Sequence, residues 1–352
     1  MLKRENYIDG IVGPQSYHEI PEIIKKIELK KQKINSTEFN VIEKFDKLNI
    51  LKNNNSKIST FLTVQEGCDK FCHFCVVPYT RGPEYSRSFN EIITEAKNLI
   101  NNGAKEITLL GQNVNAYNFQ DKRLSDLIYE LNELKGLLRV KFTTSHPNDV
   151  TVDLINAYKN CNKLMPLLHL PVQSGSTKIL KIMNRKHNIE DYISIISSLK
   201  KVKPNIKFSS DFIIGYPGET EKDFEETIKL MKDIKFINSY SFIFSPRAGT
   251  PSSKLELIDK EIAKKRLSKF QEISDSIKTN YRKSLLNTSA EVLFENRLKN
   301  QDRYFGRDEY SNSVIVDSKT NLVGRILNVK ILNFNNNTLF GEINKNDKNI
   351  AA

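Results

Sequence analysis

Three of the four cysteines lie within one short segment, GCDKFCHFC. Cys68, Cys72 and Cys75 have the spacing Cys-x3-Cys-x2-Cys, which allows a single loop to wrap its thiolates around one cuboidal cluster. A fully ligated [4Fe–4S] cluster takes four thiolates, so three leave one iron open. Because an open coordination position is typical of reactive metal sites, the pattern predicts a reactive [4Fe–4S] cluster held by these three residues.

Two other interpretations of the cysteines stay open. The thiolates could bind zinc, although structural zinc sites prefer paired Cys-x2-Cys knuckles. Cys161 could complete an electron-transfer cluster, although the fourth ligand of such a cluster usually lies in its own motif. Otherwise Cys161 is expected to be a small buried residue near a helix end. Clustered cysteines in a cytosolic protein favour metal binding over disulfides.

Length and composition indicate a globular protein with more than one domain. Its 352 residues suffice for a catalytic domain and a smaller module. No apolar run is long enough to span a membrane, and charged residues follow Met1 where a signal peptide would be apolar. We therefore expect a cytoplasmic protein without a membrane partner. The net charge of +12 fits a nucleic-acid partner, although a composition rich in Lys, Asn and Ile would give it too.

Apolar segments alternate with segments of helical period from residue 59 onward. This alternation predicts a parallel sheet. Six strands fall short of the eight in a full barrel, so we expect an α/β protein with a partial (β/α) barrel. The predicted strands are Phe61–Val64, Ile107–Leu110, Val140–Thr143, Leu167–Leu170, Phe208–Ile214 and Tyr240–Phe244.

Particular residues predict where helices begin. Ser88 and Glu91 have the spacing of a capping box, and Thr220 is predicted to cap a later helix. A short helix should open at Ile20–Ile24, and Asn53–Ser56 should be a linker. A long charged helix is marked by Leu267, Phe270, Ile273 and Ile277.

From about Thr288 onward the sequence changes to short strands separated by Asn, Asp and Gly turns. This pattern predicts a small C-terminal β-barrel of the size of an OB-fold. The predicted strands are Ala290–Phe294, Val314–Val316, Val323–Val329 and Thr338–Ile343.

Polar, Gly-rich or Pro-rich segments follow the predicted strands of the first barrel one after another. Barrel folds place their active sites at the carboxyl ends of the strands, so we expect these segments to form a ring that contacts a cofactor. The candidates in the ring are Gln112, Asn113, Ser145, Gln173 and Glu219. Asp211, like Ser209, lies within a strand and could point into the barrel or lie at a solvated strand end. His146, before Pro147, could be a base or could hold a turn.

Longer segments resemble the radical S-adenosylmethionine (SAM) superfamily and, within it, the methylthiotransferase family. The segment CDKFCHFCVVPYTRGPEYS at 68–86 carries the cysteine motif, with Phe74 at a position that is usually aromatic there. The other similar segments are LLGQNVNAY at 109–117, LPVQSGS at 170–176, MNRKH at 183–187 and FIFSPRAGTPS at 242–252. VVPYTRG at 76–82 and GQNVN at 111–115 are most similar to the MiaB type, and the tail resembles the family's RNA-binding TRAM domain.

The resemblance implies a tRNA-modifying transferase. Such an enzyme adds a methylthio group to C2 of N6-isopentenyladenosine beside the anticodon. In this family the open iron binds SAM, one electron from the cluster releases a 5′-deoxyadenosyl radical, and a second SAM supplies the methyl group. Phe74 joins the ring residues as a candidate cofactor contact, and no catalytic side chain is assigned. The expected partners are the anticodon stem-loop of tRNA, bound partly through the basic tail, and an electron donor. We expect a monomer.

Three domains are expected: the end of an N-terminal domain with a linker (1–53), a radical SAM core (54–284) and a TRAM-like β-barrel (285–346). In the family the N-terminal domain holds an auxiliary [4Fe–4S] cluster with three further cysteines, whereas no cysteine precedes Cys68 here. Ile11–His18 resembles the very end of that domain. We therefore expect a truncated chain that cleaves SAM but inserts no sulfur by itself.

Two alternative functions remain. The same machinery could act on threonylcarbamoyladenosine in tRNA or on a ribosomal protein. The chain could also be a non-catalytic RNA-binding remnant with a vestigial cluster.

Overall fold

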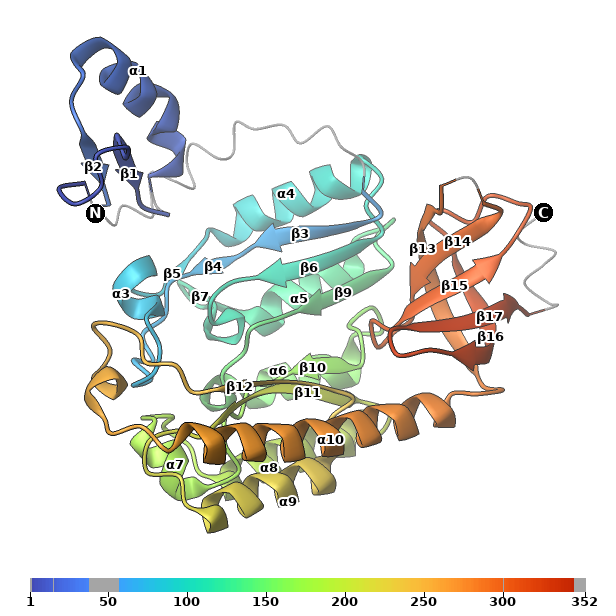
Figure 1. Cartoon of the computed structure of the whole chain (residues 1–352). Coiled ribbons are helices and arrows are strands. Elements are labelled where there is room, and N and C mark those ends of the chain that lie inside the picture. The colour runs from blue at the N-terminus through green and yellow to red at the C-terminus, as the bar shows by residue number, and fades with distance from the viewer. Residues whose placement is uncertain (1, 15, 38–56, 300, 345–352) are drawn as a thin grey trace.

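A computed structural model of the chain describes residues 2–14, 16–37, 57–299 and 301–344. A small N-terminal unit, a partial barrel and a closed C-terminal barrel follow one another along the chain (Figure 1). The linker expected at Asn53–Ser56 lies outside the described residues. None of the helices in the described ranges is long and apolar enough to cross a membrane.

The N-terminal unit consists of a strand, a helix and a second strand. β1 (Gly10–Val12) pairs in parallel with β2 (Ile34–Ser36), and α1 (Ile20–Lys30) lies between them in sequence. Pro21 fits the first turn of α1, where no hydrogen-bond donor is needed. The helix expected to open at Ile20 is therefore confirmed. The sequence analysis did not identify the two strands, because three residues are too few to show a period of two.

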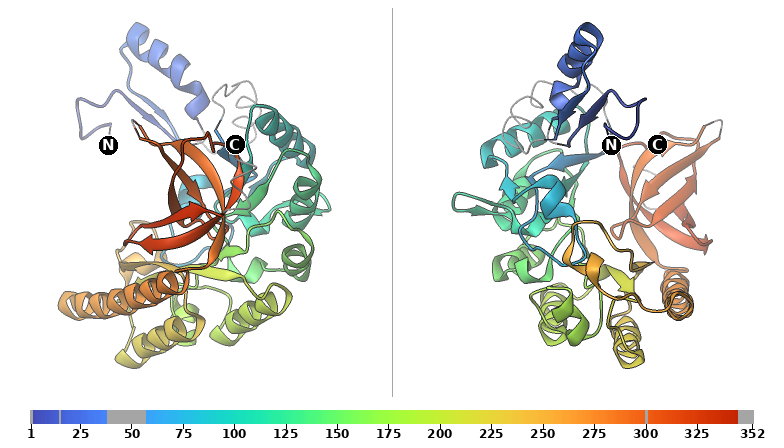
Figure 2. Two further views of the ribbon diagram at one scale, coloured as in Figure 1. Left: turned by 90° about the vertical axis from the view of Figure 1, so that its right-hand side faces the viewer. Right: turned by 60° about the vertical axis from the view of Figure 1, so that its left-hand side comes forward.

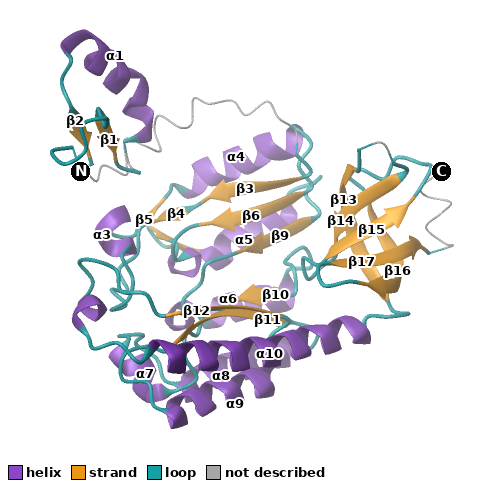
Figure 3. Cartoon of the chain, in the orientation of Figure 1, coloured by secondary structure: helices purple, strands orange, loops and turns teal. Residues whose placement is uncertain are grey.

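The central barrel is built from β3 (Ser59–Thr63), β6 (Glu106–Leu110), β9 (Arg139–Phe142), β10 (Leu167–His169), β11 (Lys207–Ile214) and β12 (Asn238–Ile243). These strands form two parallel sheets, β3-β6-β9 and β10-β11-β12 (Figure 3). An isolated parallel bridge between Val140 and Leu164 links the sheets. The prediction of six parallel strands in a partial barrel is confirmed, and the structure adds their division into two sheets.

Helices cover the outer side of both sheets (Figures 1 and 2). They are α4 (Phe89–Asn101), α5 (Leu124–Glu133), α6 (Val152–Asn160), α8 (Ile189–Val202), α9 (Glu221–Ile234) and α10 (Lys260–Ser284). Leu62, Leu109 and Phe212 pack against this layer in one continuous core. Burying each such side chain stabilises the fold by about 1.5–3 kcal/mol.

Shorter elements lie in the loops between the strands and helices. They are α3 (Val77–Arg81), α7 (Thr177–Ile182), the strands β4 (Gln65–Glu66), β5 (Tyr85–Ser86), β7 (Asn118–Phe119) and β8 (Lys122–Arg123), and the 3-10 helices Tyr17–Glu19, Val114–Ala116, Pro147–Asp149 and Pro251–Lys254.

The two predicted helix caps have different outcomes. α4 begins after Ser88, whose carbonyl accepts the Ile92 N–H at 3.1 Å, but the Ser88 hydroxyl makes no capping hydrogen bond. The predicted capping box with Glu91 is therefore wrong, because the backbone carbonyl alone starts this helix. Thr220 does cap α9, in a capping box with Asp223.

The C-terminal barrel is closed, in the strand order β13-β14-β15-β17-β16. Its strands are β13 (Ser289–Arg297), β14 (Arg303–Arg307), β15 (Ser313–Asp317), β16 (Ile326–Phe334) and β17 (Thr338–Ile343). The predicted small β-barrel is confirmed, but the sequence analysis missed β14 and placed β16 too early. Gly306 within β14 argues against a strand, yet it fits here because a Cβ would lie 2.4 Å from the Leu293 oxygen.

A buried arginine anchors the C-terminal barrel to the central one. Arg139, at the amino end of β9, donates to the carbonyl oxygens of Arg307 at 2.8 Å and Glu291 at 2.6 Å. The Tyr310 hydroxyl donates to the Asn205 oxygen at 3.0 Å. The C-terminal barrel therefore lies at the amino ends of the central strands, and the segment around α3 lies at their carboxyl ends (Figure 1).

Candidate functional site

The cysteine loop follows β4 at the carboxyl end of the first sheet. Its first residue, Gly67, has a φ of 77°, and a Cβ there would lie 1.8 Å from the Pro83 oxygen, so only glycine fits. The buried Gln65 donates to the Gly67 oxygen at 2.7 Å, and Gln112 accepts the Gly67 N–H at 2.8 Å. Gln112, a predicted cofactor contact, thus fixes the start of the loop. The sequence analysis did not identify Gln65.

The three loop thiols lie within one another's electrostatic influence. Burial, with smaller contributions from Glu84, Cys72 and Cys75, raises the pKa of Cys68 to about 12. Burial likewise raises the pKa of the Cys75 thiol. Protons that the isolated protein holds this firmly must leave when thiolates bind a metal.

Hydrogen-bond donors approach the sulfur atoms from two sides. The Val77 N–H donates to Cys75 Sγ at 3.5 Å, and the buried Arg185 donates through Nη1 to Cys72 Sγ at 3.5 Å. Nη2 of Arg185 donates to the Pro171 oxygen. Arg185 is thus paired with a thiol and a carbonyl group, and no carboxylate is among these partners.

The donor set fits a [4Fe–4S] cluster. Soft thiolates are the preferred ligands of such clusters, and hydrogen bonds to sulfur tune them. No three Cys, His, Asp or Glu side chains among the described residues are close enough to share one metal ion. Ligands of a cuboidal cluster do not need that proximity, because each thiolate binds a different iron.

Cys161 is separate from this loop. It follows α6, is 1% exposed and packs in the main core, as expected. Burial raises the pKa of its thiol to about 11, and the charges acting on it come from Glu133 and Lys203.

A polar network joins the cysteine loop to the loops after β6 and β9. Asn113 donates through Nδ2 to Glu84 at 3.0 Å and to Asp149 at 2.8 Å. Lys70, within the cysteine loop, donates to the other Asp149 oxygen at 2.7 Å. Asn113 Oδ1 is buried and has no hydrogen-bond partner in the protein. The structure therefore brings these predicted ring segments together and leaves one acceptor available.

The loop after β9 presents two more buried polar groups without partners, Ser145 Oγ and His146 Nε2. His146 holds a turn, since its Nδ1 accepts the Asn148 N–H at 3.3 Å. Burial, Arg185 and His187 lower its pKa far below the usual range. Burial and Arg185 also lower the pKa of His187 to about 4. Both imidazoles are therefore neutral at pH 7.

Gln173 and Asp211 lie where β10 and β11 meet. The Gln173 N–H donates to the Asp211 oxygen at 2.9 Å, and Gln173 has a φ of 76°. The Asp211 carboxylate lies 3.5 Å from His169 Nε2, and Ser209 Oγ lies 2.9 Å from His169 Nδ1. His169 was missed, although a lone histidine in an apolar strand was a usable signal. Of the two interpretations left open for Asp211 and Ser209, the structure supports the one in which they point into the barrel.

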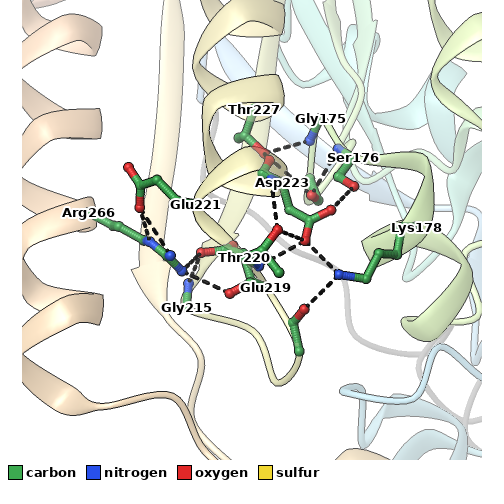
Figure 4. Close-up of polar contacts among 12 residues, drawn as sticks. Gly175, Ser176, Lys178, Gly215, Glu219, Thr220, Glu221, Asp223, Thr227 and Arg266 are labelled. Carbon is green, nitrogen blue, oxygen red and sulfur yellow. Dashed lines mark hydrogen bonds and ion pairs between the residues drawn. The ribbon is translucent and has the colours of Figure 1, made fainter.

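Glu219 faces α10. Its carboxylate accepts from Arg266 at 2.9 Å and from the Gly215 N–H at 3.2 Å (Figure 4). Burial raises the pKa of Glu219 to about 7, against the opposing effect of Arg266. Its predicted contact with a cofactor stays a prediction.

Asp223 connects the loops after β10 and β11. It accepts from Ser176 at 2.7 Å, from Lys178 at 2.8 Å and from the Thr220 N–H at 2.8 Å (Figure 4). Burial alone would raise its pKa, but the hydrogen bonds from Lys178, Thr220 and Ser176 hold it well below the usual range. The sequence analysis missed Asp223, although its spacing from Thr220 is that of a capping box.

The loops after β10, β11 and β12 also reach the cysteine loop. Phe74 packs against a small apolar cluster that includes Met183, Tyr216 and Phe244. The His73 N–H donates to the Met183 oxygen at 3.0 Å, and the His73 oxygen accepts the Ser252 N–H at 3.1 Å. Phe74 therefore lies beside the loops of the second sheet. Its predicted contact with a cofactor stays a prediction.

Comparison with known proteins gives two family matches and a structural likeness. Residues 62–231 match the Radical SAM superfamily, and residues 283–343 match the TRAM domain. Among solved structures, coproporphyrinogen III oxidase from Escherichia coli, a radical SAM enzyme, aligns with a TM-score of 0.48 at 12% identity, over 72% of this chain and 67% of that one.

Two relatives are similar over nearly the whole chain. The tRNA-2-methylthio-N(6)-dimethylallyladenosine synthase of Pelagibacter ubique is 55% identical, over 100% of this chain and 80% of its own length. The enzyme of that name from Wolbachia pipientis of Culex pipiens is 47% identical, over 97% of this chain and 79% of its own length. The chain therefore belongs to the family of tRNA-2-methylthio-N(6)-dimethylallyladenosine synthases, within the radical SAM superfamily.

Proposed function

We propose that this protein is a tRNA-modifying enzyme that adds a methylthio group at C2 of N6-isopentenyladenosine next to the anticodon. The observation that carries the proposal is the cysteine loop at the carboxyl ends of the strands, which buried polar atoms without partners surround. The chain that holds this loop is 55% identical to a tRNA-2-methylthio-N(6)-dimethylallyladenosine synthase. Cys68, Cys72 and Cys75 would hold the [4Fe–4S] cluster. When bound, the cluster and SAM supply the one-electron chemistry that generates a radical.

The protein's own residues would orient SAM and exclude water. Asn113 Oδ1 and Ser145 Oγ are available for hydrogen bonds in a buried setting, which suits the polar groups of SAM. Phe74, Gln112, Gln173, Asp211 and Glu219 are the further proposed contacts. Exclusion of water by the surrounding loops would protect a reactive intermediate from side reactions.

Reductive cleavage of SAM tests the enzymatic part of the proposal. Anaerobically reconstituted protein, reduced with dithionite, should release 5′-deoxyadenosine, measured by chromatography, and the Cys72→Ala variant should not. Equal release from both proteins would favour the non-catalytic alternative.

Nucleoside analysis tests the substrate. Deleting the gene should remove 2-methylthio-N6-isopentenyladenosine from tRNA and leave N6-isopentenyladenosine in its place, as read by mass spectrometry. Loss of the modification from threonylcarbamoyladenosine or from a ribosomal protein would point to one of the alternative substrates.

RNA binding by the C-terminal barrel is the remaining part of the proposed function. The basic residues of this barrel proposed to contact phosphate are Arg297, Lys299, Arg303, Arg307 and Arg325. Arg297, Arg303 and Arg307 also form ion pairs with acidic residues of the same barrel. Removing residues from Thr288 onward would also expose Arg139, so substitution is the cleaner test. Lys299→Ala should weaken tRNA binding and reduce the slope of log affinity against log salt by about 0.7–0.9. An unchanged slope would place RNA binding elsewhere.

A further inference from the structure

The turn between α7 and α8, residues 183–187, has a strained backbone on both sides of Arg185. Asn184 and Lys186 have φ values of 59° and 61°. Residues other than glycine rarely adopt this left-handed region, and asparagine tolerates it better than lysine does. The Lys186 side chain is exposed, so contacts of that side chain do not explain the conformation. Strain of this kind persists only where the surrounding structure enforces it, and it is concentrated at functional sites.

The residue between the two strained positions is buried and directed at the cysteine loop. Arg185 is 5% exposed, whereas Lys186 lies at the surface. Nη1 of Arg185 donates to Cys72 Sγ at 3.5 Å, and Nη2 donates to the Pro171 oxygen. Taking a cation out of water is costly, so the surrounding chain must hold this guanidinium in place.

Two side chains fix the carbonyl groups at and after Arg185. His187 Nδ1 lies 3.0 Å from the Arg185 oxygen. A carbonyl oxygen only accepts hydrogen bonds, so in the neutral imidazole Nδ1 carries the proton and donates it. Asn148, in the loop after β9, donates through Nδ2 to the Lys186 oxygen at 2.8 Å. The peptide groups that follow the arginine are therefore held by donors from both ends of the turn's surroundings.

The other half of the turn is joined to the cysteine loop. Asn184 donates through Nδ2 to the Phe71 oxygen at 2.9 Å, and the His73 N–H donates to the Met183 oxygen at 3.0 Å. Phe71, directly before Cys72, has a φ of 47° and is itself left-handed. Strained residues and hydrogen bonds thus fix both the thiol and the arginine that donates to it. None of these bonds involves the guanidinium.

We propose that residues 183–187 form a turn that holds the Arg185 guanidinium against the Cys72 sulfur, with His187 and Asn148 as positioning residues that act on the bound cluster only through Arg185. Hydrogen bonds and charge near the sulfur atoms set the reduction potential of an iron–sulfur cluster. A cation held at a short, fixed distance favours the more negative, reduced state. The inference rests on the proposed function and deepens it, because it assigns residues that tune the same site.

The midpoint potential of the reconstituted full-length protein tests this assignment. It is measured by potentiometric titration followed by electron paramagnetic resonance. At a fixed potential, Arg185→Met should lower the ratio of reduced to oxidised cluster, and His187→Phe and Asn148→Ala should each lower it about two- to fivefold. His187→Asn, which keeps a donor at the position of Nδ1, should restore most of the wild-type ratio.

Double variants separate positioning from a merely structural role. If His187 and Asn148 act through Arg185, adding His187→Phe or Asn148→Ala to Arg185→Met should produce no further change in the ratio. Their effects on the melting temperature should persist in that background, because the hydrogen bonds to the backbone carbonyls are lost with or without the guanidinium.

Asn160→Ala is the matched control for Asn148→Ala. Asn160, at the end of α6, donates through Nδ2 to the Tyr129 hydroxyl at 3.2 Å in the outer helical layer. This variant should keep the wild-type ratio. Asn148 is exposed, so its truncation leaves no buried cavity, and a melting curve for each variant verifies folding.

Iron content distinguishes this inference from the proposed function. About four irons per chain together with a wild-type ratio in both His187→Phe and Asn148→Ala overturn the inference and leave the proposed function standing. The same holds if either substitution changes the ratio equally with and without the Arg185 guanidinium. Failure of the wild-type protein to hold a cluster overturns the proposed function, and the inference with it.

Discussion

The two sides of the cysteine loop differ in how their buried polar groups are paired. On the clamp side, formed by residues 175–178 after β10, residues 215–220 after β11, α9 and α10, Asp223 accepts from several donors, and Glu219 is paired with Arg266 and Gly215 (Figure 4). On the open side, formed by the loops after β6 and β9 and the segment between α7 and α8, the buried atoms without protein partners are Asn113 Oδ1, Ser145 Oγ, His146 Nε2, Arg185 Nε and His187 Nε2.

This difference separates scaffold from binding surface. A buried polar group without a partner costs about 1–3 kcal/mol, so a group of them needs an explanation such as a ligand or an ion. Asp223 on the clamp side needs none, because its contacts are complete within the protein and fix two loops to each other. The open side has the composition expected where a polar cofactor and an anionic cluster bind.

The largest expected effect is the loss of iron from the open side. Alanine at Cys68, Cys72 or Cys75 should each reduce the iron content from about four per chain to background after anaerobic reconstitution. Iron and visible absorption are measured, with Cys161→Ala as the control that keeps both. Iron loss only in Cys161→Ala would reverse the assignment.

Breaking the clamp side should instead cost stability. Arg266→Leu leaves the buried Glu219 carboxylate without its cation, which should lower the free energy of unfolding by about 3–5 kcal/mol. Denaturant titration at pH 8 measures it. Lys269 lies on the same helix as Arg266, and Lys269→Ala, which breaks an exposed ion pair with Glu225 of α9, should cost less than about 1 kcal/mol. Equal losses in the two variants would mean that the clamp is no more than a surface contact.

The clamp side should also carry a pH dependence. The pKa of Glu219 is about 7 in the folded protein and 4.5 as its ordinary value, so the folded state binds the proton more firmly. The stability contributed by this group is present below pH 4.5 and is lost as the pH rises through 7, by on the order of 3 kcal/mol. Glu219→Gln should flatten that part of the stability profile. An identical profile in both proteins would exclude Glu219 as its source.

The smallest expected effect concerns the cation on the open side. Arg185→Met removes a charged donor to Cys72 Sγ, so the reconstituted cluster should be harder to reduce. Loss of a charged hydrogen bond of this kind should shift the midpoint potential of the cluster to more negative values, by on the order of 50 mV. Potentiometric titration followed by electron paramagnetic resonance measures it, and Arg185→Lys should retain most of the potential. An unshifted potential in the Met variant would remove Arg185 from the cluster environment.

Local patterns in the sequence predicted much of this architecture. The six central strands, the cysteine loop, the Thr220 cap and the closed C-terminal barrel all follow from periodicity or spacing over a few residues. Errors arose where local rules were overridden. Ser88 has the sequence of a capping box without its hydrogen bonds, and β14 contains Gly306, which fits only because the backbone of β13 crosses close to it.

By itself the sequence determined that three thiolates share one loop at the carboxyl end of a strand, because that depends on short spacings and on one alternation of strand and helix. Only the tertiary structure decided what surrounds them. Arg185 meets Cys72 across 113 residues of chain, and Arg266 meets Glu219 across 47. Neither pairing can be predicted from a periodic pattern in the sequence. The partners of a buried polar group come together only when the sheets and helices pack.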